Sequence, residues 1–333
     1  MTGASLDILG IGNAIVDVSA RADDAMLTRF GLTKGSMTLI DAEQAHRLYE
    51  AMGPGQESSG GSVANTMAGI ASLGGRGAFI GKVRDDQLGG IFRHDIQAVG
   101  TRFDAAPATQ GPPTARCLVF VTPDAQRTMA TFLGVSTALG EDDLDLDLCA
   151  QAKITYLEGY LWDAPPAKAA FVAAARAAHA AGKRVALSLS DPFCVERHRE
   201  SFRELVAHHV DILFANEAEI KALYEVDDFD AALQQVRGHC EVAALTRSEK
   251  GSVILSGDAV HVVDAAPVDQ LVDTTGAGDL YAAGFLHGFT QGHDLYTCGR
   301  LGALCAAEVV THVGARPLVS LRDHVMGRIA DHG

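Results

Sequence analysis

The sequence predicts an α/β protein with a doubly wound, mostly parallel sheet flanked by helices, and a small β-sheet beside it. From about residue 150 onward, apolar strand-like runs alternate with helical runs, which predicts parallel strands covered on both faces. Two earlier stretches, about 14–40 and 115–133, are extended and rich in β-branched residues, and no helix is expected within either of them. We interpret these two stretches as a lid over a site on the large sheet.

The elements of the large sheet follow one another along the whole chain, so a single domain over residues 1–333 is expected, without a linker or an internal repeat. Strands are expected at 6–11, 78–83, 154–157, 184–189, 212–214, 242–245 and 252–255. Helices are expected at 63–73, 87–99, 165–181, 196–207 and 216–224. Residues 121–127 carry Pro, Asp and Gln between two extended runs, which predicts a hairpin turn within the lid.

The charge balance limits the classes of partner. The chain has 42 acidic and 27 basic residues, for a formal charge of −15. Nucleic acids and anionic membranes require a positive surface, so neither is expected as a partner. An anionic nucleotide would have to be held locally, by backbone amides, a divalent metal and a few arginines. The hydrophobic fraction of 47% supplies enough material for a large core.

The cysteines indicate a reducing compartment. None forms a CxxC pair or a metal-ligand spacing, so we expect buried thiols and no disulfide. The apolar stretch near the N-terminus has no basic region ahead of it, and no run reaches the about 18 apolar residues of a membrane span. We therefore expect a cytoplasmic protein. The six cysteines are at positions 117, 149, 194, 240, 298 and 305.

The segment 273–279, Asp-Thr-Thr-Gly-Ala-Gly-Asp, is the most informative motif of the chain. Gly276 and Gly278 allow a sharp turn and a close backbone approach, and the apolar run that follows predicts a buried helix. The free N–H groups at the start of such a helix carry roughly half a positive charge and suit a phosphate. Asp279 would repel that phosphate unless it accepts a proton, so it is the candidate general base of a phosphoryl transfer. The alternative is a helix-capping Asp behind a glycine turn.

Two further segments suit the recognition of a polyol. Asp17 lies in an apolar extended stretch, where a carboxylate must be paired or face a ligand, because an unsatisfied buried charge is expensive. Gly61 allows close backbone approach at the start of an apolar helix, and Asn65 offers a donor and an acceptor one turn later. A structural partner for Asp17, and N-capping by Ser62, are the alternatives.

Two turns on the C-terminal half are candidates for contacts to a nucleotide and its metal. Asn216 and Glu219 share one face of a helix that follows a strand, and Glu219 there suits a water-mediated Mg²⁺ contact. An ordinary N-terminal cap explains the same pair. The turn containing Thr246, Arg247 and Gly251 is either a nucleotide-contacting turn or a plain polar loop.

Single basic residues allow two interpretations each. Arg127, at the lid hairpin, would reach over the transferred phosphoryl group, or it is a solvated surface residue. His312, near the end of an apolar helix, would border the nucleotide, or it complements the helix C-terminus. A dinucleotide-binding protein is excluded, because the glycine pair at 10 and 12 lacks its third small residue and the helix that should follow.

Taken together, these motifs resemble the ribokinase-like superfamily of sugar and nucleoside kinases, also called the PfkB carbohydrate kinases. The resemblance runs nearly end to end and includes Gly12-Asn13, the segment 60–65, Asn216 with Glu219, and 273–279. Segments 114–127, 159–160 and 187–193 resemble adenosine kinases more than ribokinases or fructokinases. The resemblance implies an ATP- and Mg²⁺-dependent transfer to the 5′-hydroxyl of a nucleoside, with adenosine the first choice. A ribokinase- or fructokinase-type sugar kinase and a kinase for inosine, guanosine or cytidine are the alternatives.

The resemblance also implies a role for each matching residue. Asp279 would be the base, and Gly276, Ala277 and Gly278 the anion hole, with Arg127 stabilising charge from the lid. The acceptor ligands would be Asn13, Asp17, Gly61, Ser62 and Asn65, with Ile15, Met37, Tyr160 and Phe193 flanking a nucleobase. The ATP contacts would be Asn216, Thr246, Arg247, Gly251, Thr275, Gly278 and His312, with Glu219 reaching the metal through water. Dependence on a monovalent cation such as K⁺ is left open, as is the choice between a monomer and a homodimer.

Two positions depart from the adenosine kinase pattern. Asp191 stands where a small residue is expected before Pro192-Phe193, and Glu158 precedes Gly159-Tyr160. We expect these carboxylates to make the nucleobase pocket more polar than an adenosine site. A catalytically silent nucleoside-binding protein would keep the pocket, but the intact run from Gly276 to Asp279 argues against that class.

Overall fold

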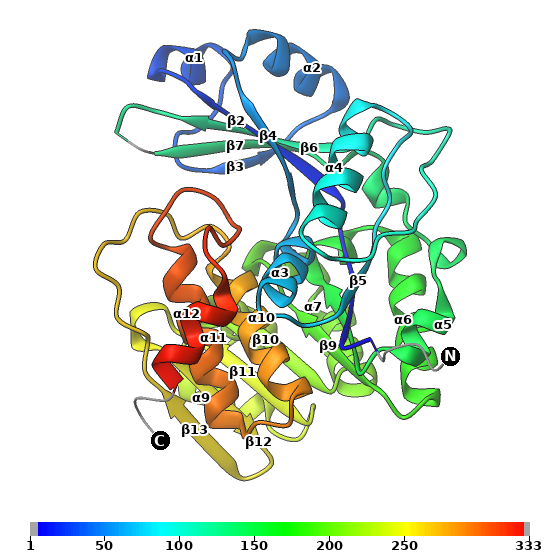
Figure 1. Cartoon of the computed structure of the whole chain (residues 1–333), viewed down its shortest axis with the longest axis vertical. Helices are drawn as coiled ribbons and strands as arrows, with labels where there is room; N and C mark the ends of the chain where they lie inside the picture. The colour runs from blue at the N-terminus through cyan, green and yellow to red at the C-terminus, as the bar shows by residue number, and fades with distance from the viewer. Residues whose placement is uncertain (1–5, 125, 330–333) are drawn as a thin grey trace.

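The protein is described by a computed structural model covering residues 6–124 and 126–329, in which the chain forms two sheets and the helices around them (Figure 1). The large sheet has eight strands in the order β13-β12-β11-β10-β9-β8-β1-β5. All neighbours from β11 to β5 are parallel, and β12 and β13 are added antiparallel at one edge. The predicted doubly wound, mostly parallel α/β fold is therefore confirmed. The strands are β1 Ile8–Ile11, β5 Gly77–Ile80, β8 Ile154–Glu158, β9 Arg184–Ser188, β10 Ile212–Asn216, β11 Val242–Thr246, β12 Ser252–Ser256 and β13 Ala259–Val263.

Helices cover both faces of the large sheet, because alternate residues of each strand enter opposite cores. In β10, Ile212 and Phe214 pack with α3, α10 and α11 on one face, while Leu213 and Ala215 pack with α6, α7 and α8 on the other. The helices are α3 Ser62–Ser72, α4 Gln87–Ala98, α5 Leu146–Gln151, α6 Pro165–Ala180, α7 Pro192–His209, α8 Glu217–Tyr224, α9 Phe229–Val236, α10 Ala277–Thr290, α11 Leu295–Val309 and α12 Leu321–Ile329.

The small sheet lies at one end of the molecule, together with two short helices (Figure 1). Its strand order is β3-β7-β6-β2-β4, with β2 at Ile15–Arg21, β3 at Met37–Leu39, β4 at Gln56–Gly60, β6 at Ala115–Val121 and β7 at Arg127–Phe132. One face packs its apolar side chains, such as Val18 and Phe120, against α1 (Asp24–Arg29) and α2 (Ala42–Ala51). The opposite face carries Ile15, Asp17, Arg127 and Met37, as the pairing register requires.

The composition of this small sheet differs from the sequence expectation in two ways. The stretch 14–40 was expected to lack a helix, but α1 interrupts it, capped by Asp23, whose side chain accepts from the Met26 N–H. The small sheet also includes β4, which pairs antiparallel with β2 and leads directly into α3. The sequence of β4, Gln-Glu-Ser-Ser-Gly, has no apolar alternation, so its pairing follows from tertiary contacts with β2.

All six cysteines are free thiols, and five of them are buried. Burial raises the pKa of Cys117 in β6 to about 12, which keeps this thiol protonated. None of the helices in the described part of the chain combines the length and the apolar composition that crossing a bilayer requires.

The helices α3, α10 and α11 approach one another closely because small residues line their contacts. A Cβ placed on Gly284 of α10 would lie 2.4 Å from the carbonyl oxygen of Leu301 in α11. A Cβ on Gly69 of α3 would lie 2.7 Å from the Cβ of Ala283 in α10. Glycine at these positions therefore sets the distance between the helices, and with it the position of the α10 N-terminus.

We predict that Gly284→Ala destabilises the fold by about 1–3 kcal/mol, because its methyl group would press on the α11 backbone rather than on a movable side chain. The free energy of unfolding, measured with a chemical denaturant, checks this. Gly90→Ala is the matched control, since a Cβ there meets nothing within 4 Å in the exposed part of α4. That variant should be neutral or stabilising by up to about 1 kcal/mol. Equal effects of the two substitutions would contradict the packing argument.

Candidate active site

The N-terminus of α10 has a backbone geometry that only glycine allows. Gly276 is the N-cap, with φ at 81°, and a Cβ there would lie 2.7 Å from the backbone of Ala315. Gly278 differs, because a Cβ there would meet nothing within 4 Å, so open space lies next to the first turn. Asp279 belongs to this first turn and does not end the preceding loop as the sequence suggested. The Ala277 N–H donates to the Thr274 carbonyl oxygen at 3.2 Å, so the N–H groups of Gly278 and Asp279 are the ones in this first turn that can bind an anion.

Helix α3 holds Asp279 from the side. The Ser62 hydroxyl donates to Oδ1 at 2.6 Å, and the Asn65 amide donates to Oδ2 at 3.0 Å. The Thr66 hydroxyl donates to the backbone oxygen of Asp279 at 3.1 Å. Ser62 therefore does not cap α3 with its side chain, and the N-cap of that helix is Gly61, with φ at 98°. A Cβ on Gly61 would lie 2.3 Å from the Asn13 carbonyl oxygen, so only glycine fits.

The electrostatic environment of Asp279 suits a base near neutral pH. Burial raises the pKa of Asp279 to about 6, although the hydrogen bonds from Ser62 and Asn65 act in the opposite direction. The carboxylate is therefore ionised at pH 7 and still basic enough to accept a proton from a polarised alcohol.

Asp17 faces the same space from the small sheet. Its carboxylate lies over Gly60, where a Cβ would be 2.5 Å from Oδ2. Burial raises the pKa of Asp17 to about 6, the positive charges of Arg316 and Arg127 oppose that shift, and the negative charge of Asp279 adds to it. In the described part of the chain no donor is bonded to the Asp17 carboxylate, so its oxygens can accept from a ligand.

Arg316 is a site residue that the sequence analysis missed. Its Nε donates to the Asn65 Oδ1 at 3.3 Å, although the two residues are 251 positions apart. No local pattern singles out an arginine in the loop after a C-terminal helix, so only the tertiary structure places it here. The one related feature in the sequence is Gly276, because its lack of a Cβ leaves room for the backbone of Ala315, the residue before Arg316.

Asn13, predicted as an acceptor ligand, has both ends of its amide engaged by the protein. Its Nδ2 donates to Glu158 at 2.7 Å, and its Oδ1 accepts from the Ser136 hydroxyl at 2.8 Å. The second carboxylate oxygen of Glu158 accepts from the Val63 N–H at 3.0 Å, in the first turn of α3. Burial raises the pKa of Glu158 to about 7, against these hydrogen bonds. Glu158 therefore joins β8 to α3 and does not line a nucleobase pocket through free oxygens.

Arg127 joins the small sheet to the loop before α10. Its Nη1 donates to Asp273 and, at 2.9 Å, to the Thr275 hydroxyl. Asp273 also accepts from the Gly314 N–H at 2.9 Å and from the Thr275 N–H at 3.0 Å. Burial of Asp273 opposes its ionisation, but these bonds and the charge of Arg127 lower its pKa overall. The Arg127 Nε is buried without a hydrogen-bond partner.

Asn216 and Glu219 form a reciprocal cap at the start of α8. The Asn216 side chain accepts from the Glu219 N–H at 2.9 Å, and the Glu219 carboxylate accepts from both nitrogens of Asn216. Burial raises the pKa of Glu219 to about 7, and the charges of Asp191 and Asp279 add to that shift. The interpretation of Asn216 and Glu219 as an N-terminal cap of α8 is therefore confirmed. Among the described residues no group of three or more His, Cys, Asp or Glu side chains is arranged to hold a metal.

The remaining residues predicted to contact the nucleotide interact with other residues of the protein. Arg247 pairs with Glu217 at 2.9 Å and lies 3.9 Å from the centre of the Phe229 ring. Gly251 has φ at 80°, and a Cβ there would lie 2.0 Å from the Val263 carbonyl oxygen. Thr246 ends β11 and pairs with Ser252 of β12, whose hydroxyl accepts from the Tyr281 hydroxyl of α10 at 2.8 Å. His312 lies 3.2 Å from Glu308, one helical turn earlier.

The predicted nucleobase contacts divide into two groups. Ile15 is buried on the site-facing side of the small sheet. Tyr160 is half-buried, and its own burial raises its pKa, as do the nearby negative charges of Asp191, Asp279, Glu219 and Glu158. Met37 and Phe193 are 43% and 68% exposed. Asp191 caps α7 by accepting from the N–H groups of Phe193 and Cys194. The unusual carboxylate at 191 is thus explained by helix capping.

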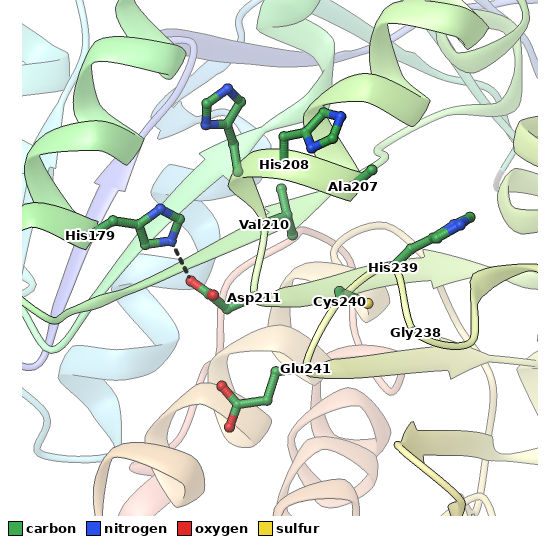
Figure 2. A pocket seen from close by; sticks show the side chains of 10 residues that line it. His179, Ala207, His208, Val210, Asp211, Gly238, His239, Cys240 and Glu241 are labelled. Carbon is green, nitrogen blue, oxygen red and sulfur yellow. Dashed lines mark hydrogen bonds and ion pairs between the residues drawn. The ribbon is translucent and has the colours of Figure 1, made fainter.

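Two hollows lie outside this constellation. One, of about 470 Å³, lies between the loop that leads to Asp273 and α11, lined in part by Asp264, Pro267 and Ala303. The other, of about 280 Å³, lies at the opposite edge of the large sheet, where His208 and His239 do not converge with the His179–Asp211 pair (Figure 2). We assign no chemistry to this second hollow.

Comparison with known proteins identifies the family. The model of the pfkB family carbohydrate kinases matches residues 29–321. The structure is similar to that of an adenosine kinase from Sinorhizobium meliloti, with 54% identity, 98% of this chain and 100% of that chain covered, and a TM-score of 0.90. It is similar to a probable sugar kinase from Rhizobium etli, with 49% identity, 97% and 98% coverage, and a TM-score of 0.91. An adenosine kinase of Saccharomyces cerevisiae is 26% identical over 326 residues, 91% of this chain and 94% of the relative.

These similarities cover the residues around Asp279, where a carboxylate, a glycine-rich turn and a helix N-terminus meet. The chain belongs to the pfkB family of carbohydrate kinases and is a phosphotransferase that acts on an alcohol group of a sugar or nucleoside.

Proposed function

We propose that this kinase transfers the γ-phosphoryl group of ATP to the 5′-hydroxyl of a nucleoside, with adenosine as the preferred acceptor. The observation that carries the proposal is the Asp279 carboxylate, held by Ser62 and Asn65 next to the open first turn of α10. The 54% identity to an adenosine kinase over nearly the whole chain supports adenosine over a free sugar. The whole chain then works as one domain, with the small sheet as its lid.

The acceptor would bind between the small sheet and α3. The unpaired Asp17 carboxylate can accept hydrogen bonds from two neighbouring hydroxyls of a ribose, and the backbone of Gly61 allows the sugar to approach closely. This arrangement would place the remaining hydroxyl at Asp279, which would take its proton as the oxygen attacks phosphorus. Ile15 and Tyr160 would then border the nucleobase.

The donor phosphates would bind at the glycine-rich turn. Open space lies beside Gly278 in the first turn of α10, and the N–H groups of this turn would stabilise the charge that develops on the transferred group. The hollow between the loop 264–269 and α11 is large enough for the base of a nucleotide and lies along the same loop as Asp273. We propose it as the place of the donor base.

The residues present are consistent with Mg²⁺ held mainly by phosphate and water. Both Glu219 oxygens already accept hydrogen bonds from Asn216, so Glu219 would act on the ion through water. When bound, the ion would neutralise charge on the phosphate oxygens. The protein itself would position the two substrates, exclude water beneath the lid and hold the proton at Asp279.

An acceptor panel tests the proposal. We expect adenosine to give a kcat/KM well above those of ribose, fructose, inosine, guanosine and cytidine, measured by ADP release.

Asp279→Ala should lower kcat by roughly 10²–10⁴-fold with little change in ATP affinity, because it removes the base alone. Asp258→Ala, on an exposed turn, serves as the control. ATP with enzyme alone should yield little ADP. A preference for a free sugar would overturn the assignment of the acceptor.

The pH dependence tests the role of Asp279. Its pKa of about 6 lies above the usual value, so kcat should fall as the pH drops below about 6 and the base becomes protonated. Ser62→Ala removes a hydrogen bond that stabilises the ionised carboxylate, so this acid limb should move to higher pH. Ser256→Ala, a partly exposed serine at the end of β12, is the control. An acid limb that stays in place in Ser62→Ala would argue against Asp279 as the titrating group.

Arg127 should act on the transition state more than on the ground state. Arg127→Ala is expected to lower kcat with a smaller change in the dissociation constants of the substrates, since the charge it meets develops during transfer. Arg21→Ala, an exposed residue of the same sheet, is the control. A change confined to the acceptor KM would reassign Arg127 to acceptor binding.

A further inference from the structure

Arg316 lies where three parts of the site meet. It follows Ala315, whose backbone packs directly under Gly276 at the start of α10. Its guanidinium reaches Asn65 in α3 through a hydrogen bond from Nε, and its charge acts on Asp17 in β2. The guanidinium is largely buried, and its Nη2 has no hydrogen-bond partner. A buried charge with an unpaired donor is costly, so the position calls for a physical explanation.

The hydrogen bond from Arg316 determines which way the Asn65 amide points. Asn65 donates through Nδ2 to the Asp279 carboxylate at 3.0 Å and accepts through Oδ1 from Arg316. A guanidinium has donors and no acceptor, so it can meet only the oxygen of the amide. With the amide reversed, its oxygen would face the carboxylate and its nitrogen would face the guanidinium, and both contacts would be repulsive. Arg316 therefore selects the orientation in which Asn65 supports the base.

The charge of Arg316 balances the carboxylates of the site. The negative charge of Asp279 disfavours ionisation of Asp17, in a protein with a formal charge of −15. Arg316 contributes the largest charge effect that keeps Asp17 ionised, ahead of Arg127. Arg127 is itself paired with Asp273, so its charge is partly offset.

We propose that Arg316 is a positioning residue with two separable roles: its Nε orients the Asn65 amide toward Asp279, and its buried guanidinium supplies positive charge to the carboxylates around the acceptor position. The inference rests on the proposed function, because both effects act on the base and on the acceptor ligand of that reaction. The first role concerns kcat, and the second concerns the binding of the acceptor.

Three substitutions separate the roles. Arg316→Gln places a neutral N–H donor at the position of Nε and removes the charge. Arg316→Lys keeps a positive charge and places a methylene at the position of Nε. Arg316→Met removes both donor and charge at similar length. Arg322→Gln, an exposed arginine of α12, is the control for the loss of one positive charge.

We expect Arg316→Met to lower kcat/KM for the nucleoside roughly 10- to 100-fold, the range of a hydrogen bond to a charged group. Arg316→Gln should keep most of kcat, raise the acceptor KM and move the acid limb of kcat/KM to higher pH. Arg316→Lys should keep the KM and the acid limb and lose kcat.

The titratable and charged groups around these two residues come from several elements. Asp17 is faced by Arg316 from the loop after α11, Arg127 from β7, Asp279 from α10 and Cys117 from β6. Arg316 is also faced by Asp95 from α4.

The outcomes distinguish failure of this inference from failure of the proposed function. If the wild type phosphorylates the nucleoside and Arg316→Met does so with unchanged kcat/KM, the inference is overturned. Parallel losses in all three variants, with lowered melting temperatures and an unshifted acid limb, would also overturn it, since they indicate a purely structural arginine. A wild type that is inactive on every nucleoside would instead contradict the proposed function.

Discussion

The site depends on the hydrogen bonds that α3 makes to Asp279. Ser62 and Asn65 bind its two carboxylate oxygens, and Thr66 binds its backbone oxygen. Because these donors come from consecutive turns of one helix, the carboxylate has little freedom to rotate. The close approach of α3 and α10 at Gly69 makes this geometry possible. A base held in this way needs no rearrangement when the acceptor arrives, which is how a positioned group lowers a barrier.

The supports of α3 extend this constraint into the rest of the molecule. The side chain of Ser62 is used on Asp279, so α3 has no side-chain cap of its own, and Glu158 meets its first turn at the Val63 N–H instead. On the other side, Arg127 and Asp273 connect the small sheet to the loop before α10. Movement of the small sheet is therefore linked to the turn that would hold the phosphates, which is the connection a lid requires.

The fold and the central motif could be predicted from the sequence because both are local patterns. Alternating strand and helix periodicity determined the parallel sheet, and the glycine-rich run before an apolar helix located the α10 N-terminus. The strand β4 and the helix α1 were missed, since β4 has no apolar alternation and α1 has only six residues. Arg316 and the role of Glu158 were missed because their partners are distant in sequence. For Asn13, local residue type was compatible with ligand binding, and only the tertiary structure shows the protein partners that engage it. For Glu219, the cap with Asn216 is local and was one of the two interpretations that the sequence allowed.

The most direct test of the account is a crystal structure of the wild-type enzyme with a nucleoside and a non-hydrolysable ATP analogue. The account predicts that the acceptor hydroxyl lies about 2.6–3.2 Å from an Asp279 carboxylate oxygen, with the γ-phosphate at the first turn of α10 on its other side. An acceptor hydroxyl bound away from Asp279, with this carboxylate engaged only by Ser62 and Asn65, would contradict it.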